Sequence, residues 1–97
     1  MFNKQKAQEI ADEVVELLKR KGRDYSGRNI SITGLLGVAV RLVDKAMRLH
    51  HLTTKTSSPQ FESVEDTLKD VVGYGIIGLL VLRKQWTDDV DIEEVNK

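Results

Sequence analysis

Apolar residues along this chain recur at the spacing of a helix, and the strict alternation of a half-buried strand is missing. The repeat is clearest in the range 4–21, where one side of a helix would carry Ile10, Val14, Leu17 and Leu18. Gly22 follows as a natural stop signal. The pattern therefore predicts a first helix over 4–21 and an all-α fold, which we take as a single domain over 1–97.

A second helix is predicted after a short polar stretch. Ser31 or Thr33 can cap its start, because a hydroxyl oxygen accepts hydrogen bonds from the first backbone N–H groups of a helix. The apolar pattern then continues to about Leu52. The residues TTKTSS, over 53–58, read as a polar linker.

The third predicted helix begins at Ser58 and Pro59, a favourable cap followed by a favourable first residue. It extends to about Trp86, which we interpret as a packing anchor. Beyond it, Thr87 and the two aspartates that follow can cap a short additional C-terminal helix.

The second half of this third helix reads GYGIIGLLVL, over 73–82, and is apolar on every side. A helix of this kind is buried all round, and three helices can hardly cover it, so we expect a dimer or tetramer. Glycines inside a helix suggest that another helix or a ligand comes close. Five of the seven glycines lie inside predicted helices: Gly34, Gly37, Gly73, Gly75 and Gly78.

Four carboxylates crowd the start of the third helix, in the stretch ESVEDTLKD over 62–70. Three of them, spaced four residues apart, form one stripe along the helix: Glu62, Asp66 and Asp70. Like charges at this spacing destabilise a helix by roughly 0.2–0.5 kcal/mol per pair, so something must offset them. Solvation, facing cations or a bound metal ion could each do so.

The polar side of the second helix supplies candidates for the last two explanations. Asp44 could join the stripe in holding Mg²⁺, which prefers hard oxygen ligands together with phosphate oxygens and water. Arg41, Lys45 and Arg48 lie on the same side of this helix. They could bind phosphate groups, or they could pair with the acidic stripe and leave no need for a metal.

The stretch GRDYSGRN, over 22–29, lies between the first two predicted helices. Its glycines would let the backbone approach a phosphate, Arg23 and Arg28 could grip that phosphate, and Tyr25 could stack on a base. The pattern of a P-loop is missing, and a plain connection between helices explains the same residues.

Two further groups have the residue types of a metal site without its arrangement. His50 and His51 are adjacent and would point about 100° apart on a helix, so we expect them to interact with the helix C-terminus instead of sharing a metal. Glu13 and Glu16 have a suitable helical spacing, but the lysines and arginines nearby favour a solvated face.

Composition narrows the classes of function. Fifteen basic and fifteen acidic residues cancel, so no overall field favours nucleic acid or an anionic membrane. The absence of cysteine excludes disulfides and thiol chemistry. The longest apolar run is too short to cross a bilayer, and the first residues lack the apolar core of a signal peptide. We therefore expect a cytoplasmic protein whose partner is neither nucleic acid nor a membrane.

Three segments resemble, in order and spacing, a known family: RDYSG (23–27), VRLVDKAMRL (40–49) and ESVEDTLKDVVGYGI (62–76). The family is the phage and bacterial nucleotide modification associated domain 1, which shows Lys-x-Asp-Tyr-Gly, Arg-x-x-Asp-Lys-x-x-Arg and Glu-Ser-x-x-Asp-Thr-x-x-Asp. That family is in turn similar to the all-α MazG and dUTPase-like nucleotide pyrophosphohydrolases. Those enzymes bind Mg²⁺ through two metal motifs, Glu-x-x-Glu on one helix and Glu-x-x-Asp on the next. They split a nucleoside triphosphate into monophosphate and pyrophosphate.

The resemblance implies a MazG-like helical bundle, completed by oligomerisation, that hydrolyses nucleotides with Mg²⁺ or Mn²⁺. The implied metal ligands are Asp44, Glu62, Asp66 and Asp70. The implied catalytic carboxylates are Glu62, Glu65, Asp66 and Asp70. The implied nucleotide contacts are Arg23, Asp24, Tyr25, Arg28, Arg41, Lys45 and Arg48.

The chain departs from the enzyme pattern at three places. Arg41 stands where the first metal motif begins with a glutamate, and Thr67 stands three residues before Asp70, where the second has its first acid. In the loop, Ser26 is inserted before Gly27. The alternative is a helical oligomer that binds nucleotide or protein without catalysis.

Overall fold

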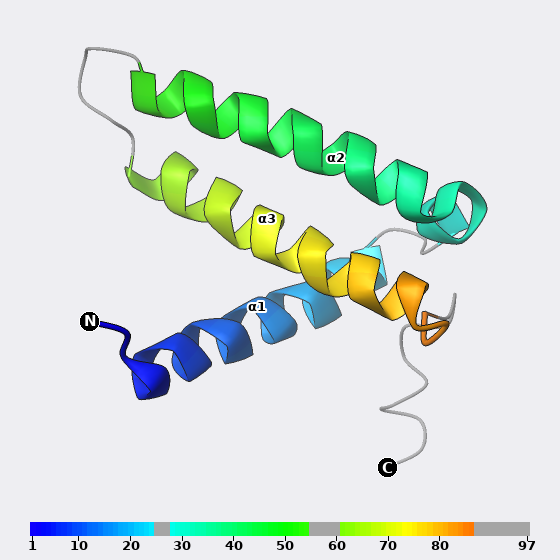
Figure 1. The fold of residues 1–97 in the computed structure, drawn as a ribbon, viewed down its shortest axis with the longest axis horizontal. Helices are drawn as coiled ribbons and strands as arrows, with labels where there is room; N and C mark the ends of the chain where they lie inside the picture. Colours follow the sequence, from blue (N-terminus) through cyan, green and yellow to red (C-terminus); the bar gives the residue numbers. More distant parts are fainter. Residues whose placement is uncertain (25–27, 55–60, 87–97) are drawn as a thin grey trace.

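A computed structural model describes residues 1–24, 28–54 and 61–86, in which all regular secondary structure is helical. The helices are α1 (Lys4–Asp24), α2 (Arg28–Thr54) and α3 (Phe61–Leu82). The predicted all-α class is confirmed. α2 and α3 run antiparallel and side by side, while α1 crosses α3 obliquely (Figure 1). α3 packs against both other helices and is therefore the centre of the fold.

The start of α1 is capped by Asn3. Its side-chain Oδ1 accepts a hydrogen bond from the backbone N–H of Lys6 at 2.9 Å, which satisfies one of the donors that the first turn leaves unpaired. The predicted stop at Gly22 is wrong, because α1 continues to Asp24. Lys21, which lies in this last turn, forms an ion pair with Asp70 on α3 at 2.8 Å.

α2 is interrupted at Gly34, whose φ of 61° and ψ of −147° are not helical. Glycine adopts this backbone region far more readily than other residues do. The interruption follows Thr33, one of the two predicted caps, so the long regular part of α2 starts where we expected it. The helical residues from Arg28 to Thr33 come in addition, so the predicted loop over 22–29 is too long at both ends.

The end of α2 takes in two residues that we assigned to the linker. Thr53 Oγ1 donates to the carbonyl of Leu49 at 2.9 Å, and Thr54 Oγ1 donates to that of His50 at 2.8 Å. These bonds let a threonine occupy the last helical turn, because its hydroxyl pairs within the helix. The rest of the linker and the predicted Ser58-Pro59 cap lie outside the described residues.

α3 ends at Leu82, before the predicted Trp86. The chain turns because Lys84 has a left-handed φ of 59°. The backbone N–H of Gln85 then donates to the carbonyl of Leu80 at 2.7 Å, and that of Lys84 to Val81 at 3.0 Å. This is the Schellman arrangement that closes many helices, here with lysine where glycine is usual. The helix suggested after residue 86 lies outside the described part.

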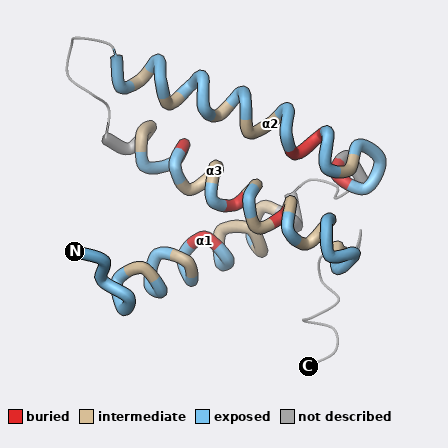
Figure 2. The backbone as a smooth tube through the Cα atoms, in the orientation of Figure 1, coloured by how far each residue is buried: buried red, intermediate tan, exposed pale blue. Residues whose placement is uncertain are grey.

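After the end of α3, Trp86 folds back onto the start of α2. Its Nε1 donates to Oγ of Ser31 at 3.1 Å, and its ring packs against the apolar core. The predicted packing anchor is thus confirmed. The core is small: among the described residues, the buried apolar side chains are Val14, Ile30, Val38 and Ile77, and Figure 2 shows how few buried positions there are.

Two glycines of α3 let its neighbours come close, as their positions inside a helix suggested. A Cβ at Gly73 would lie 3.1 Å from Cδ2 of Leu18 on α1. A Cβ at Gly78 would lie 3.3 Å from Cγ1 of Val38 on α2. None of the described helices is long and apolar enough to cross a membrane.

Candidate functional site

Asp70 lies on α3 at the point where the other two helices approach it. Its Oδ1 accepts a hydrogen bond from Nζ of Lys21 on α1 at 2.8 Å. Its Oδ2 pairs with Nζ of Lys45 on α2 at 3.1 Å. The Asp70 side chain is 18% exposed, so this carboxylate links all three helices in a partly buried position.

The pKa of Asp70 reflects two opposing effects. Partial burial acts to raise the pKa, because it disfavours the charged form. The hydrogen bonds from Lys21 and Lys45 act in the other direction and prevail, so the pKa of this carboxyl lies below its ordinary value. Asp70 is therefore ionised at neutral pH, with both oxygens facing ammonium groups.

Two of the three segments quoted above for their resemblance, 40–49 and 62–76, meet at this carboxylate, and Lys21 adds a residue next to the third. Lys21 stands just before the segment 23–27, Lys45 lies within the segment 40–49, and Asp70 lies within the segment 62–76. Residues far apart in the chain are thus joined in space, since 49 positions separate Lys21 from Asp70. This meeting point is the strongest candidate for a functional site.

The acidic stripe of α3 does not act as one unit. Asp66 is exposed and lines an open groove of about 740 Å³ between α1 and α3. The groove is otherwise lined by Glu9, Asp12, Glu13, Glu16, Leu17, Arg20 and Lys69. The side chain of Glu62 lies outside the description. Asp66 therefore faces the carboxylates of α1, whereas Asp70 faces two lysines.

Lys69, which lines this groove, forms ion pairs with two carboxylates. Its Nζ lies 3.2 Å from Oε2 of Glu65, one turn earlier on α3, and 3.4 Å from Oε1 of Glu13 on α1. Hydrogen bonds to Glu65 first, and then to Glu13, raise the pKa of Lys69 above its ordinary value. Glu65 is engaged with a cation in this arrangement, although its side chain is 70% exposed.

The predicted cations of α2 behave differently from one another. In the part of the chain that the structure describes, Lys45 pairs with the acidic stripe, whereas Nη1 of Arg41 donates to the carbonyl of Gly37 on its own helix at 3.1 Å. Arg48 and Asp44 are exposed. Facing cations therefore offset one member of the stripe, Asp70, and one of the two is Lys21, which we did not expect.

A magnesium site is not preassembled among the described residues, where no three His, Cys, Asp or Glu side chains are grouped to hold a metal ion. Both oxygens of Asp70 face lysines, so a metal at this carboxylate would have to displace an ammonium group. Asp44 and Asp66 are exposed. The predicted four-carboxylate site stays a prediction.

The predicted nucleotide contacts of the first loop cannot be built into this site. Their side chains lie outside the described part: Arg23, Asp24, Tyr25 and Arg28. Beside Asp70, between α1 and α3, lies a cavity of about 20 Å³ that Lys21 and Tyr74 help to line. It has room for about one water molecule and is too small to hold a nucleotide.

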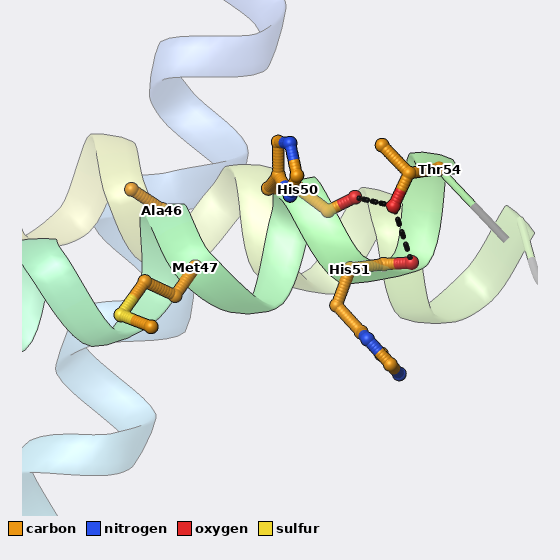
Figure 3. A pocket seen from close by; sticks show the side chains of 5 residues that line it. All are labelled: Ala46, Met47, His50, His51 and Thr54. Carbon is orange, nitrogen blue, oxygen red and sulfur yellow. Dashed lines mark hydrogen bonds between the residues drawn. The ribbon is translucent and has the colours of Figure 1, made fainter.

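The two histidines of α2 lie on the surface, around a hollow of about 510 Å³ that Ala46, Met47 and Thr54 also line. The imidazole rings of His50 and His51 point in different directions (Figure 3). Thr54 Oγ1 donates to the backbone carbonyls of both residues, at 2.8 and 3.4 Å. The different directions of the two rings match the expected angle between adjacent residues of a helix.

The sequence analysis did not identify two lysines that pair with the carboxylates of α3, Lys69 and Lys21. Lys69 had a usable signal, because it follows Glu65 by four residues on the same helix. Lys21 had none, since nothing local connects it with Asp70.

Comparisons of this chain with protein-family models, curated proteins and solved structures give no match. Its function must therefore be inferred from its residues and their geometry.

Proposed function

We propose that this protein binds nucleoside triphosphates and hydrolyses them to monophosphate and pyrophosphate, as the MazG-like enzymes that its motifs resemble do. The observation that carries the proposal is the convergence on Asp70 of the end of α1, the polar side of α2 and the acidic start of α3. Each of these parts comes from, or adjoins, one of the three resembling segments.

The cationic side of this site suits phosphate groups. Lys21 and Lys45 are 39% and 29% exposed, so their ammonium groups can be reached from solvent. Lysine is a common phosphate ligand, and exposed Arg48 lies on the following turn of α2. Arg41 would need to leave the carbonyl of Gly37 to join them.

The remaining roles follow the resemblance. Mg²⁺ or Mn²⁺ would enter with the phosphates and neutralise part of their charge. The carboxylates proposed to hold the ion are Asp44, Glu62, Asp66 and Asp70, with Glu65 as a further ligand or base. The residues proposed to contact the phosphates, base and sugar from the first loop are Arg23, Asp24, Tyr25 and Arg28.

The test is incubation of the pure protein with a panel of ribo- and deoxynucleoside triphosphates, with and without Mg²⁺, followed by chromatography of the products. We expect monophosphate and pyrophosphate from at least one nucleotide, lost with chelator and in Asp70→Asn. Asp12→Asn, an exposed carboxylate change on α1, should retain turnover. Intact nucleotides throughout, with protein shown to be folded, would overturn hydrolysis.

A non-catalytic nucleotide-binding module is the second candidate. It is favoured by the two lysines that already satisfy Asp70, because this arrangement needs no metal. Melting experiments separate the candidates, since a ligand that binds only the folded state raises the melting temperature. An increase with nucleotide alone, unchanged by Mg²⁺ and without turnover, would favour this module.

A further inference from the structure

α3 carries an exposed apolar stripe on the side that neither α1 nor α2 covers. Its large side chains are 42–61% exposed: Leu68, Val72, Leu79 and Leu82. Together with Gly75 they recur at alternating steps of four and three residues, which is the seam pattern of two helices packed along each other. At about 100° per residue, all five positions fall within about a quarter of the helix circumference.

Gly75 lies at the middle of this stripe. Among the described residues, nothing lies within 4 Å of the place where its Cβ would be, whereas Gly73 and Gly78 make room for α1 and α2. A glycine in a helix interior costs about 1 kcal/mol relative to alanine. Packing among the residues that the structure describes does not require that cost, which points to a backbone approach from outside the protomer.

The stripe is nearly symmetric about Gly75. Leu68 and Leu82 stand seven residues before and after it, while Val72 and Leu79 stand three before and four after. If a second copy of α3 ran antiparallel, a two-fold axis at Gly75 would place Leu68 opposite Leu82 of the partner subunit. Val72 would likewise lie opposite the partner subunit's Leu79. Such self-complementarity is what a two-fold interface requires.

The charges beside the stripe fit the same arrangement. Glu65 and Arg83 are exposed and lie on the same flank of the stripe, ten residues before and eight after Gly75. When two antiparallel helices are related by a two-fold axis, the same flank of each helix lies on the same side of the interface. Glu65 would therefore lie near Arg83 of the partner subunit, and the symmetry would repeat this pair once more in the dimer. A parallel pairing would instead leave these opposite charges about 27 Å apart along the helix axis.

From these observations we infer that the protein forms a two-fold dimer in which α3 packs antiparallel against α3 of a second copy, centred on Gly75. The same rotation brings α2 of both copies to one side of the seam, so the two α2–α3 pairs form a four-helix arrangement. The inference does not depend on nucleotide hydrolysis, because the apolar stripe lies on a different face of α3 from Asp70. Glu65, on the flank of the stripe, pairs with Lys69 of its own helix and is the one residue that both proposals use.

The first test is the mass of the protein in solution, by sedimentation or light scattering. The wild type should have twice the protomer mass of 11.0 kDa. Gly75→Glu should fold, since the site is open within the protomer, but should have the protomer mass because two carboxylates would meet at the axis. Ile10→Glu, a charge at an exposed apolar site of α1, should stay dimeric. A monomeric wild type, or a dimeric Gly75→Glu, would overturn the inference.

The second test determines the orientation, using the absence of native cysteine. Under oxidation, Gly75→Cys should cross-link to itself, since a disulfide needs Cα atoms about 4.4–6.8 Å apart. Leu68→Cys and Leu82→Cys should each stay uncross-linked alone and form a mixed dimer when refolded together. Self-cross-linking of Leu68→Cys would show parallel helices and contradict the proposed seam.

Charge reversal tests the pairing at the flank. Glu65→Arg alone should weaken the dimer, because it brings two arginines together. Glu65→Arg combined with Arg83→Glu should restore the wild-type dissociation constant. A double variant no tighter than Glu65→Arg alone would show that these two positions do not meet.

Discussion

At the scale of the residue, Asp70 shows how a like-charged stripe can be tolerated. Its carboxylate is partly buried, which by itself disfavours the charge, yet two ammonium groups from different helices compensate. Removing one member of such a group leaves partly buried charges without a partner, which is more destabilising than the net contribution of the pairs. Asp70 is thus a structural link between helices as well as a candidate ligand.

Asp70→Asn should therefore lower the free energy of unfolding by about 1–3 kcal/mol near pH 7. The pKa of Asp70 is depressed by folding from its ordinary 3.8, so the stabilisation is present above that value and is lost as the pH falls through the lower folded-state pKa. Urea unfolding at about pH 7 and about pH 2 should show a gap between wild type and variant that closes in acid.

The matched control for this prediction is Asp66→Asn, one turn earlier on the same helix and exposed. It should change the free energy of unfolding by less than about 0.5 kcal/mol. Equal losses at the two positions would mean that the lysines do not distinguish Asp70 from its neighbour.

At the scale of the element, the helix ends depend on single backbone conformations. α3 stops because Lys84 adopts a left-handed φ and two backbone hydrogen bonds close the turn behind it. A residue with a Cβ is strained there, whereas glycine is not. Gly34, which has a positive φ inside α2, is the corresponding case where the chain does use glycine.

Lys84→Gly should consequently raise the free energy of unfolding by about 0.5–1 kcal/mol, since it removes that strain. Thermal or urea unfolding measures the change. Lys84→Ala is the control, because it removes the charge and keeps the Cβ, and it should bring no such gain. Stabilisation of the same size by alanine would assign the effect to the charge.

At the scale of the whole molecule, the fold is an α2–α3 pair with α1 attached to it. The described contacts between α1 and α3 include Leu18 against Gly73 and two ionic links, from Lys21 to Asp70 and from Lys69 to Glu13. The Glu13 side chain in the second link is 58% exposed, so dissolved salt can screen that pair. With so small a core, resistance to local opening should differ between helices.

Native-state hydrogen exchange should show this difference. The first half of α1, whose side chains are mostly exposed, should exchange fastest, and the middle of α3 around buried Thr67 and Ile77 slowest. Raising the salt concentration to about 1 M, where the screening length is about 3 Å, should speed exchange in α1 more than in α2. Equal protection in α1 and α3 would contradict this account of the attachment.

Much of the architecture was predictable because its causes are local. A 3.6-residue apolar repeat identifies helices without knowledge of their partners, and glycines inside helices pointed to the close approaches at Gly73 and Gly78. The boundaries were less predictable. Gly22 did not stop α1, which continues to Asp24, and Trp86 lies beyond the end of α3, where its side chain donates to Ser31.

For the candidate site too, some features follow from the sequence and others only from the tertiary structure. The sequence by itself determined an all-α chain and a run of carboxylates on the third helix whose repulsion something had to offset, because periodicity and charge are properties of neighbouring residues. Only the tertiary structure decided that Lys21 and Lys45 bind Asp70, that Asp66 faces α1 and that one side of Gly75 is open. These features depend on which helix faces are pressed together, and that is decided by packing between segments far apart along the chain.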